Sequence, residues 1–128
     1  MYKEMLADLT SKISSSDNLY KNEDIEIIEQ YPNKCAVYIE KVTAMESAIN
    51  TARFRMEPEE YREYIMELDR SRKIIHDALI SDTKLLNKIC QIYGYPEIFT
   101  GNINDRNEIA EFAKKIVDEF FEKRQKAV

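Results

Sequence analysis

The sequence predicts an all-α fold, an antiparallel helical bundle of four main helices plus a short extra helix. The 128 residues include only 2 Gly and 3 Pro, which is too few turn residues for a many-stranded sandwich or barrel. Apolar residues recur every three or four positions along most of the chain, as they do on one face of an α-helix. The length suits a single domain, residues 1–128, with one hydrophobic core.

The N-terminal part of the chain contains three helical segments. In residues 2–13 the apolar side chains have helical spacing, and the polar run SSSDN at 14–18 ends the segment because these residues favour local hydrogen bonds. Residues 22–31, NEDIEIIEQY, predict a short acidic helix. Proline suits the first turn of a helix better than its interior, so the next helix is expected from about Pro32 to Phe54.

The longest apolar stripe in the chain runs along the segment from Pro32 to Phe54 and ends just beyond it, at Met56. Its members alternate at intervals of three and four residues, so they should face the centre of the bundle. A carboxylate at Met45 or Ile49 is therefore expected to unfold the domain, because it would bury an unpaired charge. The stripe consists of Cys35, Tyr38, Val42, Met45, Ile49, Ala52 and Met56.

The next long helix should begin at Pro58 and run to about Ile80. The connection that precedes it is short, so this helix and the one before it should be neighbours that form the spine of the bundle. Ser81 or Asp82 is expected to cap a further helix, which Gly94 ends.

The last predicted helix begins at Asp105, which has the spacing of a capping box with Glu108. Its apolar face is broader than one groove of a small bundle would cover. Phe121 lies about 100° round the helix from Phe120, so one of the two rings is left for another surface. Together with Phe99 in the preceding loop, these rings predict the interface of a homodimer. The alternative is that Phe121 packs under the N-terminal helix and the protein is a monomer.

Charge and cysteine content disfavour several classes of function. A net charge of −5 and a pI near 5.0 disfavour nucleic-acid binding, which needs clustered Lys and Arg. No window approaches the roughly 20 apolar residues of a membrane span, and no signal-peptide pattern occurs, so a cytoplasmic protein without membrane contact is expected. Cys35 and Cys90 are far apart in the sequence, which predicts two reduced, packed thiols.

The single histidine, His76, belongs to a polar cluster on the helix predicted for residues 58–80. At about 100° per residue, Asp69, Arg72 and His76 project on the same side of that helix, beside its apolar face. Three interpretations are open. Asp69 can pair with Arg72 while His76 lies at the rim of the core. Alternatively, Arg72 and His76 can form an anion or phosphodiester site, or the cluster can belong to a polar interface.

Arg70, five intervening residues and His76 resemble the arginine–histidine motif of the HEPN family. This resemblance implies a metal-independent helical ribonuclease or a nucleotide-binding module, often dimeric, with Arg70 and His76 as candidate catalytic residues. Arg70 projects about 120° away from His76, whereas Arg72 lies closer to it, so Arg72 is a third candidate. Because the chain is also acidic, robust nuclease activity is not expected.

A wider resemblance covers most of the second half of the chain. The segments LDRSRKIIHDALI, LLNKI, DRNEIAEFA and DEFFEKR resemble a small bacterial family catalogued as a domain of unknown function, numbered three-two-three-two. The resemblance implies a bacterial, cytoplasmic protein. It brings no activity, substrate or catalytic residue with it.

Neither a metal nor a cofactor is expected. One histidine cannot supply the two Glu-x-x-His segments of a di-iron bundle, zinc ligands are lacking, and no glycine-rich phosphate loop occurs. The sequence thus predicts a non-enzymatic protein-interaction or regulatory module whose partner is itself or another protein. The alternatives are a HEPN-like ribonuclease or nucleotide-binding module, and a binder of a small anionic ligand at Asp69, Arg72 and His76.

Overall fold

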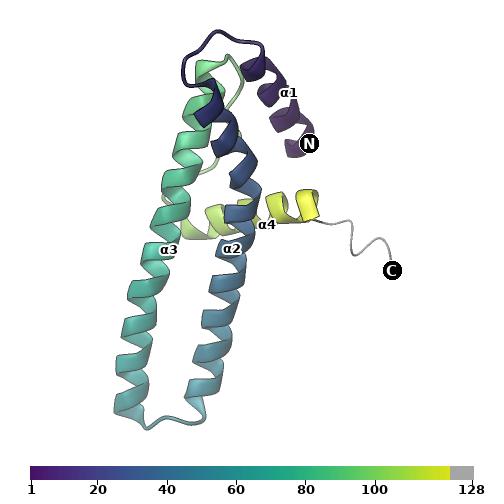
Figure 1. Cartoon of the computed structure of the whole chain (residues 1–128). Coiled ribbons are helices and arrows are strands. Elements are labelled where there is room, and N and C mark those ends of the chain that lie inside the picture. Colours follow the sequence, from purple (N-terminus) through teal and green to yellow (C-terminus); the bar gives the residue numbers. More distant parts are fainter. Residues whose placement is uncertain (122–128) are drawn as a thin grey trace, which may run out of the picture.

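A computed structural model describes residues 1–121 of the protein, and this range contains four α-helices and no strand. They are α1 (Tyr2–Ser14), α2 (Lys21–Arg53), α3 (Pro58–Ile92) and α4 (Arg106–Phe121). The all-α prediction is confirmed. Figure 1 shows α2 and α3 as a long hairpin with α4 lying across it, while α1 packs against α2 and α4. The arrangement is therefore a hairpin crossed by a helix, and four helices of one antiparallel bundle are not seen.

Helix α2 continues through Pro32, so the short extra helix predicted for residues 22–31 does not exist as a separate element. Proline removes one backbone N–H from the helix, which costs the bond to the carbonyl of Ile28. Pro32 and its neighbours Tyr31 and Cys35 are all buried. Burial of this turn against the rest of the core offsets the missing hydrogen bond. The sequence alone did not indicate that this turn is buried.

Helix α3 likewise continues through Ser81 and Asp82, where a new helix was predicted to begin. The Asp82 carboxylate accepts from Lys34 Nζ at 3.3 Å, and the Thr83 hydroxyl donates to the carbonyl of Leu79 at 2.8 Å. These polar side chains are satisfied within a continuous helix, so they do not act as caps. The hairpin is consequently built from two helices of 33 and 35 residues.

The end of α3 follows the prediction for Gly94. This residue has a φ of +78°, in the left-handed region that favours glycine. The Gly94 amide donates to the carbonyl of Gln91 at 3.1 Å, and the Tyr95 amide donates to that of Cys90 at 2.8 Å. This pair of bonds is a Schellman motif, which satisfies carbonyls at the helix end.

The beginning of α4 is capped by Asp105, as predicted. Its carboxylate accepts from the amides of Asn107 at 2.9 Å and Glu108 at 3.4 Å. Glu108 does not complete the capping box, because its carboxylate accepts instead from the amide of Asn102 at 3.2 Å. The loop before α4 is thereby tied to the first turn of the helix.

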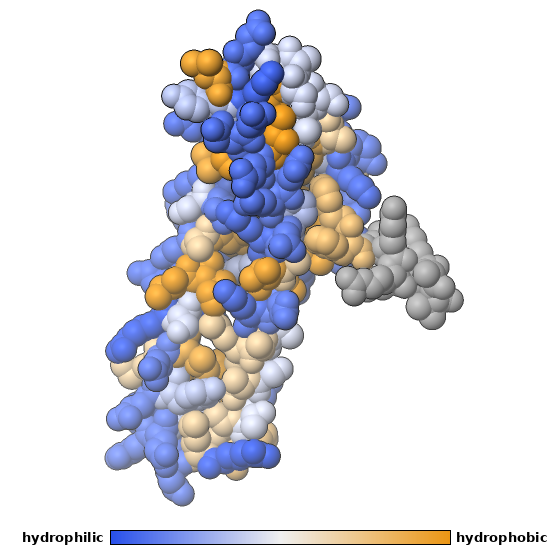
Figure 2. All heavy atoms as spheres, viewed as in Figure 1, coloured by the Kyte–Doolittle hydropathy of each residue, from blue (hydrophilic) through white to orange (hydrophobic). Residues whose placement is uncertain are grey.

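We call the part of the hairpin that includes α2 up to Tyr38 and α3 from His76 onward its upper half, and the part nearer the turn its lower half. The hydrophobic core lies where α1, α4 and the loop before α4 pack against the upper half. Beyond Tyr38 on α2 and before His76 on α3, Ala52 is the only buried residue among positions 39–75. In Figure 2 this lower half is blue along α3 and pale along α2. The core consists of Leu6, Leu9, Ile13, Ile28, Tyr31, Cys35, Tyr38, Leu79, Leu86, Ile89, Cys90, Tyr93, Ile98, Phe99, Ile109, Phe112, Ala113 and Ile116.

Candidate functional site

His76 lies inside the hairpin and faces α2. Its side chain is 5% exposed, and its Nδ1 lies 2.8 Å from the phenol oxygen of Tyr38. The two rings meet edge to face with their centroids 5.1 Å apart. The phenol and the imidazole therefore satisfy each other at the lower boundary of the core.

The electrostatic surroundings keep His76 neutral. Burial lowers the pKa of its imidazole below 6.5, and the positive charges of Arg106 and Arg72 lower it further, against a small opposing effect of Asp77. Burial also raises the pKa of Tyr38 to about 12. At neutral pH the pair is thus an uncharged phenol–imidazole hydrogen bond beside two guanidinium groups.

The polar cluster predicted on α3 is assembled differently from the prediction. Asp69 is exposed and Arg72 is half-buried. Within residues 1–121 the ion pairs join Met1 with Glu4 and Glu119, and Lys34 with Asp82, so Asp69 and Arg72 form no such pair. The Nε atom of Arg72 is buried and, in the same range, has no hydrogen-bond partner.

Arg106 is a member of this cluster that sequence analysis missed. It is the first residue of α4, and its charge acts on both His76 and Tyr38. The charge reaches them only because α4 crosses the hairpin, and no local sequence signal indicates that crossing. The structure thus brings Arg72 and Arg106 to the Tyr38–His76 pair.

Arg70 does not join the cluster. It is exposed, and its charge is not among those that act on His76. Its position agrees with the 120° separation on the helix. The structure therefore does not bring together the arginine and histidine of the HEPN-like motif.

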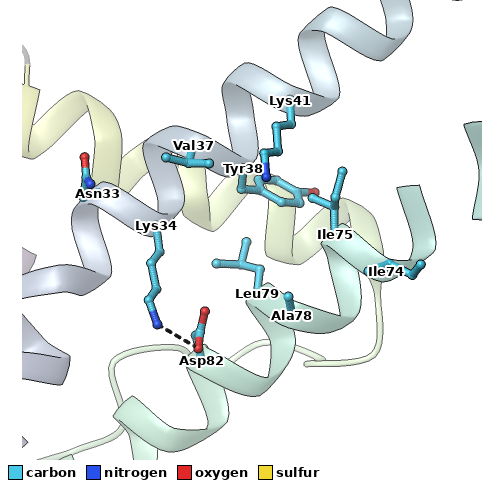
Figure 3. Close-up of a pocket in the computed structure, with 10 residues that line it drawn as sticks. All are labelled: Asn33, Lys34, Val37, Tyr38, Lys41, Ile74, Ile75, Ala78, Leu79 and Asp82. Carbon is cyan, nitrogen blue, oxygen red and sulfur yellow. Dashed lines mark hydrogen bonds and ion pairs between the residues drawn. The ribbon is translucent and has the colours of Figure 1, made fainter. Parts of the chain in front are cut away.

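A groove between α2 and α3 is the second feature with functional potential. Its upper part has a volume of about 350 Å³. In Figure 3 Tyr38 and Leu79 line it between the two helices, and the Lys34–Asp82 ion pair crosses one end. Val37 and Ile74 stand at its rim and are 41% and 69% exposed. The full lining is Asn33, Lys34, Val37, Tyr38, Lys41, Ile74, Ile75, Ala78, Leu79 and Asp82.

A second hollow of about 450 Å³ continues this groove toward the tip of the hairpin. Ala44 and Ala48 follow Val37 and Lys41 at a spacing of seven residues, so all four lie on one face of α2. Both hollows are lined by α2 and α3, and the lower one also by Arg55 and Met56 of the turn between them. We call the combined surface the hairpin groove. Its lower lining is Ala44, Ser47, Ala48, Thr51, Ala52, Arg55, Met56 and Tyr64.

The three aromatic residues predicted to form a dimer interface occupy two different environments. Phe120 and Phe121 line a pocket of about 640 Å³ between α1, α2 and α4, and Phe121 is 40% exposed. Phe99 is 7% exposed and packs on Phe112, with ring centroids 5.1 Å apart. Phe99 therefore belongs to the core, whereas Phe120 and Phe121 remain at a surface pocket.

A buried amide holds the loop before α4 in place. Asn87 Nδ2 donates to the carbonyl of Phe99 at 3.0 Å, and the Phe99 amide donates to Asn87 Oδ1 at 3.1 Å. These two bonds pair the side-chain amide of Asn87 with the backbone of Phe99 and leave neither polar group unsatisfied. Sequence analysis did not identify Asn87, because a lone asparagine among apolar residues carries no distinguishing local pattern.

Neither a metal site nor a membrane span is present in the part of the chain that the structure covers. No three His, Cys, Asp or Glu side chains there are grouped closely enough to hold a metal ion. No helix in that part is long and apolar enough to cross a bilayer. The buried thiol of Cys35 has its pKa raised to about 12 by burial, so it is protonated and unsuited to metal binding.

Comparisons with known proteins give one match. No curated protein and no solved structure matches the chain. One family model spans nearly the whole sequence, from residue 3 to residue 126, and the resemblance found in the segments around His76 is thereby confirmed. The chain belongs to the family described as protein of unknown function (DUF3232).

Proposed function

We propose that this protein is a non-enzymatic binding module that recognises another protein chain through the hairpin groove. The observation that carries the proposal is the exposure of Val37 and Ile74 at the rim of an apolar hollow. Exposed apolar residues that are scattered singly need no explanation, but these two lie on the lining of one apolar hollow, which is typical of a binding surface. The two reduced, buried thiols suit our proposal that the module works in the cytoplasm of a bacterial cell.

The shape of the groove suits a helical partner. Two parallel ridges with a row of small side chains between them accept the apolar face of an amphipathic helix. Ala44 and Ala48 on α2 and Ala78 on α3 leave room for such a close approach. The charged residues at the rim, among them Lys34, Lys41 and Asp82, would select the orientation of the partner.

The geometry gives less support to a ribonuclease. A general acid or base must reach the proton that it transfers, and His76 is buried with Tyr38 as its hydrogen-bond partner. Arg70, the other residue of the HEPN-like motif, is exposed and apart from it. A phosphodiester could contact His76 only after the hairpin opened at this level.

Binding of a small anion is a second candidate function, and one observation favours it. Arg72 Nε is buried without a partner among residues 1–121, and Arg106 contributes a second positive charge nearby. A phosphate or carboxylate group would satisfy the Arg72 Nε donor, and the positive charge of Arg106 would add to the attraction. Isothermal titration with inorganic phosphate would test this function. We expect binding that Arg72→Met abolishes, and heat signals identical for both proteins would exclude it.

Site-specific photo-crosslinking tests the leading proposal. A photoreactive amino acid at Val37, which faces the groove, should give covalent adducts with a protein chain in the native cells. The same amino acid at Lys114, an exposed residue of α4, serves as the matched control. The adducts should disappear when Ile74→Glu is added. Equal adducts from both positions, or none from Val37, would contradict the proposal.

A further inference from the structure

We propose that a second copy of this chain occupies the hairpin groove, in a dimer whose two-fold axis runs parallel to the long axis of the hairpin. This inference rests on the proposed function and names the partner. The charges on the two rims of the groove, their levels along the hairpin and the area of the groove support it. Each copy would then cover the groove of the other with its own pair of helices, so that the two grooves face each other.

The rim formed by α2 is basic. Lys34 and Lys41 line the upper part of the groove, and Arg55, just past the end of α2, lines the lower part. All three side chains belong to exposed residues. The other α2 residues that line the groove are uncharged. Glu40 is exposed and lies three residues after Val37 and four before Ala44, so it shares their face, and α2 presents three positive charges and this one carboxylate to a partner.

The rim formed by α3 is acidic. Asp82 lines the upper part of the groove. Glu60 and Glu67 are exposed and lie four residues before and three residues after Tyr64, which lines the lower part. At those spacings they share the face of Tyr64. Arg70 lies about 120° round the helix from Tyr64, toward the outer side of α3.

Residues on α2 and α3 lie at matched levels along the hairpin. Lys34 pairs with Asp82 at 3.3 Å, and at the next level Tyr38 contacts His76 at 2.8 Å. At the tip of the hairpin, Arg55 lies two residues past the end of α2 and Glu60 is the third residue of α3, so the two lie at about the same level. Opposite charges therefore lie at the same height on the two rims near both ends of the groove.

This charge pattern selects one of two face-to-face arrangements. A two-fold axis parallel to the hairpin places α2 of one copy over α3 of the other at equal height. Arg55 then faces Glu60 of the partner subunit, and Lys34 faces Asp82 of the partner subunit. An axis perpendicular to the hairpin would place α2 on α2 and α3 on α3, with like charges together. Electrostatic complementarity favours the first arrangement.

The area of the groove is adequate for a stable dimer. From Glu60 to Asp82, α3 spans 23 residues, or roughly 35 Å at 1.5 Å per residue. Two helices side by side are about 20 Å wide, so the flat footprint is roughly 700 Å². Standard interfaces bury about 800 Å² per partner, and side chains add area beyond the flat estimate. A smaller ligand would leave much of this surface uncovered.

Sedimentation equilibrium of the full chain at micromolar concentration tests the dimer and its face. We expect a species of twice the 15.1 kDa chain mass. Ile74→Glu, at a site 69% exposed in one chain, should fold normally and weaken dimerisation by at least about 100-fold. Phe121→Glu is the matched control on the pocket between α1, α2 and α4, and it should remain dimeric. A monomeric wild type, or loss of the dimer in Phe121→Glu alone, would overturn the proposal.

Charge exchange tests the direction of the axis. Arg55→Glu and Glu60→Arg should each weaken the homodimer by about tenfold, because two symmetric pairs become like-charged. An equimolar mixture of the two variants should restore dimers of wild-type affinity, since each chain then offers the charge that the other lacks. The inferred axis would be wrong if the mixture dimerised no better than either variant alone.

These experiments separate this inference from the broader proposed function. A monomeric protein whose Val37 position still cross-links to a different protein would overturn the dimer and leave the binding module standing. An absence of both dimer and adduct would overturn both. Adducts made only between two copies of the chain would support both.

Discussion

The upper and lower halves of the α2–α3 hairpin have similar sequence patterns and different burial. In the upper half, Tyr31, Cys35 and Leu86 are at most 1% exposed, because α1, α4 and the loop before α4 pack around them. In the lower half, Val42, Met45 and Ile49 continue the same spacing of three and four residues, yet they are only partly buried. Periodicity thus identifies which residues face the neighbouring helix, and a third layer decides whether they are buried.

The lower half also differs in the polarity of its surface. Along α2 the residues between Lys41 and Arg53 include a single charged one, Glu46. A solvated helix in a small domain normally has about a quarter to a third of its surface residues charged. This low charge beside a partly covered apolar seam is what a helix at an interface requires, and it is a further reason for placing a partner over this half.

The largest difference between the two halves should appear on truncation of their apolar residues. Leu86→Ala removes a fully buried side chain and should lower the free energy of unfolding by about 3 kcal/mol. Ile49→Ala in the lower half should lower it by only about 1 kcal/mol. Urea melts in the Ile74→Glu background, where association does not contribute, would measure both. Equal losses at the two sites would remove the distinction between the halves.

A carboxylate in the lower half should be tolerated, contrary to the expectation from the sequence. Ile49→Asp and Met45→Asp place the charge at partly buried positions from which it can reach water. We now expect each to cost about 2 kcal/mol, without unfolding the upper half. Circular dichroism in the same background should show a helical protein with a lowered melting temperature. Complete unfolding would show that the lower half is part of the cooperative core.

The hydrogen bond between Tyr38 and His76 marks the boundary of the two halves. Tyr38→Phe keeps the ring but leaves a buried imidazole nitrogen without its partner, and should cost about 1 kcal/mol. Tyr61→Phe, on a partly buried tyrosine of the lower half, is the matched control and should change the unfolding free energy by less than half of that. Urea melts of both variants provide the test. Equal effects would mean that the boundary bond contributes nothing specific.

The smallest expected effect is on the pH dependence of stability. Because the pKa of His76 is lowered below 6.5 in the folded chain, the unfolded chain takes up this proton first as the pH falls. The stability linked to the neutral imidazole is therefore fully present above pH 6.5 and is lost progressively between pH 6.5 and the folded pKa. His76→Gln should flatten this part of the curve of unfolding free energy against pH. An unchanged slope would show that another group titrates there.

Local signals predicted the helix ends well and the helix interiors less well. Gly94 and Asp105 act through backbone geometry within a few residues, and both serve as predicted. Pro32 and Asp82 carry equally strong local signals for helix starts, but tertiary packing and the pairing with Lys34 keep both inside long helices. Local propensity is a weak prior wherever burial of the same turn opposes it.

The candidate site was predictable only as far as one helix reaches. The side of α3 that carries Arg72 and His76 follows from angular spacing, and the structure places these two residues together. Tyr38 and Arg106 come from other helices, and their part in the cluster depends on the register of α2 and on the crossing of α4. The hairpin groove could not be predicted either, because each of its two walls is one long helix that the sequence analysis predicted as two separate helices.

Hydrogen exchange tests most directly the claim that the lower half of the hairpin lacks cover within one chain and obtains it from a second. The amides of residues 44–51 in α2 would be followed in the wild type over a range of protein concentrations, with Ile74→Glu as the comparison. In Ile74→Glu we predict that these amides exchange much faster than those of residues 28–38, at rates independent of concentration. In the wild type their exchange should slow as the concentration rises. Rates in the wild type that are independent of concentration and as slow as those of residues 28–38 would contradict the account.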